Sequence, residues 1–215
     1  MEPVLRNIDY HTTETILLTL CFTFIALARI THENRFASFI SLVVSDKYLK
    51  IYGKDKNLNL IWFNFLLFTV QAVVFGILLK ESLEQFEIVK QVSLVLVIAS
   101  IVLFVLFKFY LEKLVAEILE LQKFSENYNF HKLSYRNYIG IILLPLVALI
   151  IYNPAAGKVL TLIALCLFVI LNTISFFLTL KNHQKFIRSG VFYFILYLCA
   201  LELAPYLLIY KWGYY

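Results

Sequence analysis

The chain has 215 residues, of which 61% are hydrophobic and 15% are charged, and its formal net charge is +5. This composition, with a mean hydropathy of +0.81, lies outside the range of soluble globular domains and indicates a membrane protein. The basic residues are spread over several loops, so anionic lipid is the expected partner and nucleic acid is not.

Six apolar stretches are long enough to cross a bilayer, which requires about 20 helical residues. They are residues 12–29, 59–79, 91–107, 138–152, 157–180 and 190–210. We therefore predict an all-α, polytopic membrane helix bundle with six transmembrane helices, forming a single integral membrane domain over residues 1–215. The fourth stretch contains Pro145, where we expect a kink rather than a break because neighbouring helices can satisfy the carbonyl that a proline frees.

Two amphipathic segments follow the first and third apolar stretches. In residues 34–50, apolar side chains recur with the i, i+3, i+4, i+7 spacing of one helix face, at Phe36, Phe39, Ile40 and Val43. This spacing predicts a helix lying in the membrane interface. Residues 109–124 would likewise form a helix with one apolar face and one charged face. This pattern predicts an extension of the third helix beyond the membrane. We expect both interfacial helices on the cytoplasmic side.

Lys and Arg residues alternate between the segments that the six stretches leave. With residues at the ends of stretches counted in the loops, the second, fourth and sixth segments hold 14, and the other four hold 5. Short loops rich in Lys and Arg stay in the cytoplasm. We therefore predict cytoplasmic loops near 30–57, 108–137 and 181–189, in a multi-pass protein of the bacterial inner (cell) membrane with both termini periplasmic. Acidic residues precede the first stretch, so a cleavable signal peptide is not expected.

Three polar residues at membrane depth form a candidate intramembrane site: Glu202, Gln71 and Asn172. Glu202 lies roughly 18 Å from the inner end of its stretch, at 1.5 Å per helical residue. A carboxylate at this depth is costly and indicates a proton or solute site. The other interpretation is a hydrogen bond between helices, with Gln71 or Asn172 as the partner of Glu202.

Basic side chains at the inner ends of the apolar stretches are candidates for lipid binding. Arg29 and Lys108 each adjoin a stretch, and Arg35 lies in the first amphipathic segment. Long basic side chains can extend from such positions to lipid headgroups. We therefore predict that these three contact anionic lipid at the cytoplasmic face.

The sequence predicts no catalytic, cofactor-binding or metal-binding residues. The four histidines lack the close spacing of metal ligands on a helix, and the common phosphate-binding and nucleophile motifs are missing. Cys21, Cys166 and Cys199 lie in apolar stretches and are expected to pack as small apolar side chains. The Asn-Pro-Ala triplet at residues 153–155 predicts a turn.

Particular residues connect the chain to a known family. They are Ala28-Arg29, Arg35-Phe36, Asp46-Lys47-Tyr48-Leu49 and the last stretch from Phe192 to Pro205. On these residues the chain resembles an uncharacterised family of integral membrane proteins of the Bacteroidota, known as a domain of unknown function. The resemblance implies a bacterial inner-membrane location, and it brings no substrate and no catalytic residues.

Three functional hypotheses follow. The leading one is a non-enzymatic membrane protein that supports envelope assembly or scaffolds membrane protein partners through its cytoplasmic face. The alternative is a small-solute or proton-coupled transporter that uses Glu202. A weaker alternative is a membrane-embedded lipid-modifying enzyme, in which His131, His183 and basic loop residues would act on lipid phosphates.

Overall fold

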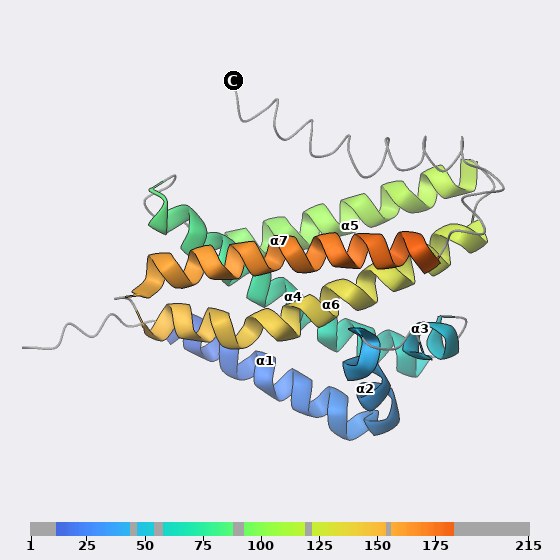
Figure 1. Ribbon diagram of the computed structural model, residues 1–215, viewed down its shortest axis with the longest axis horizontal. Helices are drawn as coiled ribbons and strands as arrows, with labels where there is room; N and C mark the ends of the chain where they lie inside the picture. The colour runs from blue at the N-terminus through green and yellow to red at the C-terminus, as the bar shows by residue number, and fades with distance from the viewer. Residues whose placement is uncertain are drawn as a thin grey trace, which may run out of the picture.

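The computed structural model describes residues 12–43, 47–53, 58–87, 93–118, 122–153 and 156–182. Every regular element in these ranges is helical, as Figure 1 shows. The elements are α1 (Thr12–Thr31), α2 (Glu33–Ile40), the 3-10 turn η1 (Ser41–Val43), α3 (Lys47–Tyr52), α4 (Leu58–Gln85), α5 (Leu94–Ile118), α6 (Gln122–Tyr152) and α7 (Gly157–Asn182).

Five of these helices are long and apolar enough to cross a membrane. The candidate spans are Thr12–Thr31, Ile61–Gln85, Leu94–Ile118, Ser125–Tyr152 and Gly157–Asn182. They correspond in order to the first five predicted stretches, so the chain is an all-helical, multi-pass membrane protein. The sixth predicted stretch, 190–210, lies outside the described residues, and so does Glu202.

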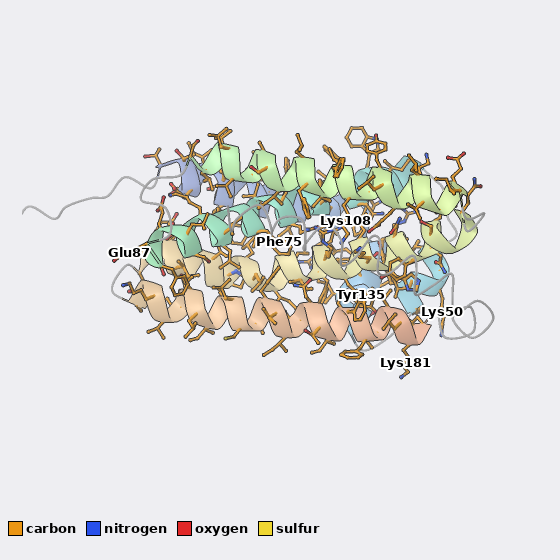
Figure 2. The ribbon with its side chains drawn as sticks, turned by 90° about the horizontal axis from the view of Figure 1, so that it is seen from above. Lys50, Phe75, Glu87, Lys108, Tyr135 and Lys181 are labelled. Carbon is orange, nitrogen blue, oxygen red and sulfur yellow. The ribbon has the colours of Figure 1, made fainter. Side chains whose placement is uncertain are left out.

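Helices α4 and α6 form the centre of the bundle. In the most apolar window of each, 56% of residues are buried, against 17% for α5 and 11% for α7. Helices α1 and α5 pack on α4, and α7 packs on α6. Figure 2 shows α5 along one edge of the bundle and α7 along the other, with the central pair between them in that view. Both central helices start at the end of the bundle that holds α2 and α3, so they run in the same direction.

Glycine allows the central helices to approach closely. A Cβ atom placed on Gly140 of α6 would lie 2.9 Å from the Cα atom of Gln71 on α4. One placed on Gly76 of α4 would overlap the side chain of Ile98 on α5. Small residues at such positions let the backbones of transmembrane helices approach, which strengthens their van der Waals packing.

The segment predicted as one interfacial helix over 34–50 differs in the structure. Helix α2 ends at Ile40, a 3-10 turn follows, and α3 begins only at Lys47. The rings of Phe39 on α2 and Tyr48 on α3 are in contact, so the segment is folded on itself.

Phe39, Leu42, Tyr48 and Leu49 of this segment are buried in protein, whereas Ile40 and Ile51 are exposed. Phe39 makes edge-to-face ring contacts with Tyr48 at 5.4 Å, Phe63 at 5.8 Å and Tyr138 at 5.8 Å. Tyr48 also stacks on Phe130 of α6 at 5.9 Å. Phe39 of the predicted pattern therefore packs on α4 and α6, together with Tyr48 of α3.

The predicted loop before the fourth stretch is also different. The extension of α5 is found as far as Ile118, but α6 already begins at Gln122, so 122–124 do not continue α5 and residues 125–136 are helical. The predicted span 138–152 is only the second half of a helix of 31 residues. Pro145 lies inside this helix without ending it, as expected.

The two ends of the bundle differ in charge, and we name them the α2–α3 end and the Glu87 end. Figure 2 places Lys50 and Lys181 at the first and Glu87 at the second. Within the described residues, the helix halves at the α2–α3 end carry the basic residues Arg29, Arg35, Lys47, Lys50, Lys108, Lys113, Lys123, Lys132, Arg136 and Lys181, against the acidic residues Glu33, Glu112, Glu117 and Glu126. The halves at the Glu87 end carry Lys80 and Lys158.

Candidate functional site

A cavity of about 610 Å³ lies between α5 and α7, with α4 and α6 behind it. Its apolar part is lined mainly by phenylalanine and aliphatic side chains, which are Phe75, Leu79, Ile101, Phe104, Val105, Phe168 and Phe176. Its basic part is lined by Lys108, Lys132 and Arg136. The cavity is therefore amphipathic along its length.

The two parts are ordered along the bundle. Figure 2 shows Phe75 toward the middle of the bundle and Lys108 closer to the α2–α3 end. Lys132 and Arg136 are four residues apart on the half of α6 that begins at the α2–α3 end, so their side chains lie on one face of that helix. The three cations thus lie toward the α2–α3 end, whereas Phe75 of α4 and Phe168 of α7 lie deeper in the bundle.

One basic residue of the cavity, Lys132, is held by neighbouring side chains, and Lys108 is buried. The Lys132 Nζ atom lies 2.9 Å from Oε1 of Glu112 on α5, and 5.8 Å from the ring centre of Tyr128. Lys108 is only 5% exposed, and Glu112, one turn further along α5, is 4% exposed. The ion pair between Lys132 and Glu112 joins α6 to α5 at the basic part of the cavity.

The charge of the lining is one-sided. Lys108, Lys132 and Arg136 are the charged residues among the described residues of the lining, and all three are basic. Charge–charge attraction is stronger in a protein interior than in water, so this end favours an anion. A guanidinium such as that of Arg136 can bind two oxygens of a phosphate or carboxylate.

Uncharged polar groups from α5 and α7 also line the cavity. They are Ser100, Asn172, Ser175 and Thr179. Asn172 donates a hydrogen bond from Nδ2 to the Phe168 carbonyl at 2.8 Å, and the Ser100 hydroxyl donates to the Leu96 carbonyl at 2.7 Å. These bonds to their own helices fix the side chains at the wall of the cavity.

Of the three residues of the predicted intramembrane site, the structure describes Gln71 and Asn172. Asn172 lines the cavity, whereas Gln71 is fully buried where α4 meets Gly140 of α6. Glu202 lies outside the described residues.

The predicted lipid contacts also separate. Lys108 is inside the cavity, and Arg29 is exposed at the end of α1. Arg35 lies with its guanidinium carbon 4.9 Å from the ring centre of Tyr52. Sequence reasoning missed Lys132 and Arg136, although their spacing of four residues on one helix was a usable signal.

Two ionisable groups near Arg35 are shifted by their surroundings. Burial lowers the pKa of the His32 imidazole, and the charge of Arg35 lowers it further. Burial raises the pKa of the Tyr48 phenol well above its ordinary value. Both groups are therefore uncharged near neutral pH. His131 is buried on α6, and His183 lies outside the described residues.

A second group of charged side chains connects helices at the Glu87 end. The Lys80 Nζ atom lies 2.7 Å from Glu14 of α1, and 3.9 Å and 3.8 Å from Glu81 and Glu84 of its own helix. Next to it, the Tyr152 hydroxyl donates a hydrogen bond to the Thr15 hydroxyl at 2.9 Å. These contacts connect α1 to α4 and α6, which is a structural role.

Comparison with known proteins gives one result that covers nearly the whole chain. The family model described as "Domain of unknown function (DUF4271)" matches residues 15–212. No curated protein and no solved structure matches the chain.

Proposed function

Because the chain belongs to the family of the domain of unknown function DUF4271, we propose a function from its own geometry: it binds an anionic lipid in the cavity between α5 and α7. In this proposal the acyl chain lies along the phenylalanine-lined part, and the headgroup lies against Lys108, Lys132 and Arg136. The protein acts without chemical turnover, as an envelope-assembly or scaffolding component of a bacterial inner membrane, as in the Bacteroidota.

The observation that carries this proposal is the match between the cavity and a lipid. Its basic residues lie toward the α2–α3 end, and Phe75, Phe104 and Phe168 lie deeper in the bundle. The headgroup and the acyl chain of a lipid in a membrane follow one another in the same order. The phenylalanine rings make close contacts with the acyl chain. These contacts replace those that the acyl chain would make with surrounding lipid. The basic part then supplies preference for an anionic headgroup.

The distribution of charge supports the choice of leaflet. Basic residues concentrate at the α2–α3 end, and such ends face the cytoplasm in bacterial membranes. With this orientation the headgroup site lies in the cytoplasmic leaflet, where the surface is rich in anionic lipid. In this orientation the first residues of α1 would face the periplasm.

The α2–α3 layer supports the scaffolding part of the proposal. It is a folded layer at one end of the bundle, fixed by Phe39 and Tyr48 in its interior. Its exposed side chains include Lys47 and Lys50, which can contact anionic lipid or a membrane protein partner. Lipid binding in the cavity and partner binding at this layer would act at the same end of the molecule.

A lipid-binding measurement tests the proposal. Purified protein is titrated with phosphatidylglycerol and with phosphatidylcholine in mixed micelles, and the affinities are compared. We expect phosphatidylglycerol to bind more tightly, and Arg136→Gln to weaken it about tenfold, which is about 1.4 kcal/mol and within the range for a charge-assisted hydrogen bond. The matched control is Lys181→Gln, an exposed basic residue at the same end, which should leave the affinity unchanged. Equal affinity for both lipids, or equal loss in both variants, contradicts the proposal.

The other two functional hypotheses are distinguished by the same preparation. A proton-coupled or solute transporter using Glu202 would lose transport in Glu202→Gln while its folding stayed intact; the position of Asn172 in the cavity is the observation that favours this second candidate. A lipid-modifying enzyme would return a chemically altered lipid after incubation.

A further inference from the structure

Two side-chain amides are completely buried between the central helices. Gln71 on α4 and Asn137 on α6 are both 0% exposed. The oxygen and nitrogen of each amide are without a hydrogen-bond partner within the described residues. Neither residue is part of the cavity lining described above, so the lipid site does not account for them.

The two amides lie in the same helix interface. Gln71 packs against Gly140, where an added Cβ atom would come within 2.9 Å of its Cα atom. Asn137 precedes Gly140 by three residues, which places it one turn away on the same side of α6. Because α4 and α6 run in the same direction, Asn137 is displaced from Gln71 toward the α2–α3 end.

A third amide extends this row. Asn64 precedes Gln71 by seven residues, so both lie on one face of α4. Its Oδ1 atom is also buried without a hydrogen-bond partner within the described residues. Asn64, Asn137 and Gln71 thus follow one another along the α4–α6 interface, and we name them the amide row.

Unpaired amides are costly at this place. In the interior of a membrane bundle, neither lipid nor apolar side chains can form hydrogen bonds with them. An amide offers two N–H donors and one carbonyl acceptor. A water molecule needs two to four polar partners of this mixed kind and is the usual occupant of such sites. A cation is a poorer match, because each amide offers it one carbonyl oxygen and would keep two N–H donors unpaired.

We propose that the amide row is a hydrated site inside the bundle, in which water molecules bridge Gln71 and Asn137 and continue toward Asn64. The water satisfies both amides and keeps α4 and α6 in register where close packing at Gly140 brings them together. This site is independent of the lipid-binding cavity, and either can be present without the other.

The reactivity of introduced cysteine thiols tests whether water occupies the amide row. Cys21, Cys166 and Cys199 are first replaced by Ala, and single cysteines are then introduced as Gln71→Cys and Asn137→Cys. The matched controls are Val74→Cys on α4 and Leu143→Cys on α6, two positions that are also 0% exposed but lie in the apolar core. The probe is Ag⁺, which reaches thiols through narrow hydrated spaces. Folding of each variant is checked by its thermal unfolding curve.

We expect the thiols at 71 and 137 to react at least about tenfold faster than those at 74 and 143, because a thiol in apolar surroundings stays protonated and unreactive. Equal rates at all four positions overturn the proposal, since the amides then pair with each other in a dry interface. If neither amide variant folds, hydroxyl-radical labelling of the unaltered protein decides. Labelling of buried Leu67, next to the row on α4, above that of buried Ile77 supports bound water, and equal labelling overturns it.

Discussion

Glu112 shows how one residue affects both the stability and the chemistry of the cavity. Its carboxylate lies 2.9 Å from the Lys132 ammonium, and its side chain is 5% exposed against 21% for that of Lys132. Removing one member of a buried ion pair is costly because the other keeps its charge. The same carboxylate also reduces the positive potential that a lipid phosphate would experience.

Glu112→Gln should therefore lower stability and raise affinity for anionic lipid. We expect a loss of about 2 kcal/mol in the free energy of unfolding, less than for a fully buried pair because Lys132 is partly exposed. Unfolding in mixed micelles and a titration with phosphatidylglycerol measure the two effects. Glu117→Gln, at an exposed position on the same helix, is the control and should change neither. A destabilised variant with weaker lipid binding would argue against a headgroup near Lys132.

Single residues also show how far the site could be predicted. The sequence identified Lys108 and Asn172, which both line the cavity, because charged and amide side chains are conspicuous in apolar stretches. It missed Lys132 and Arg136 because they lay in a segment predicted as a polar loop. The phenylalanines gave no signal, because a Phe that lines a cavity and a Phe that contacts lipid look the same in the sequence of a membrane helix.

Among the elements, the contact between α4 and α6 depends on Gly140. An added methyl group would meet the Gln71 backbone at 2.9 Å, and backbone cannot move aside as a flexible side chain can. The two central helices must then separate, which would loosen their packing along the whole interface.

Gly140→Ala should accordingly destabilise the protein by about 1–3 kcal/mol, the usual cost of overpacking an interior. Gly157→Ala is the matched control, because its added methyl group would meet only the amide end of the Gln85 side chain. Thermal unfolding of both variants measures the difference. Equal stability of the two would mean that close approach at Gly140 contributes little to the helix pair.

The elements that were predicted are recognisable from their own apolar or amphipathic sequence, whereas those that were missed depend on contacts with other helices. Apolar length alone indicated the five described spans, and the extension of α5 to Ile118 followed from its amphipathic face. The first half of α6 was missed because its buried face carries Tyr128, His131, Ser134 and Tyr135, which look polar in sequence. They are buried by neighbouring helices, and helix contacts of this kind leave no local pattern. The turn at η1 was missed for a similar reason, because the return of Tyr48 onto Phe39 is a tertiary contact.

For the molecule as a whole, the asymmetry of charge predicts the direction of insertion. With basic residues concentrated at the α2–α3 end, the positive-inside rule places that end in the cytoplasm. A reporter that is active only in the cytoplasm should work when fused after Asn57, and one active only in the periplasm should work when fused after Tyr215. Activity of the cytoplasmic reporter at Tyr215 would contradict the six-span topology with periplasmic termini.

The shared direction of α4 and α6 has a consequence for biogenesis. Two helices that cross a membrane in the same direction require another crossing between them, so α5 must be inserted before the central pair can form. Until α6 is synthesised, the most buried face of α4 has only lipid or transient neighbours, and the Gln71 amide is exposed to them. A nascent chain that stops before Gln122 therefore presents an incomplete α4 surface, which membrane quality-control proteases could use to distinguish it from the finished protein.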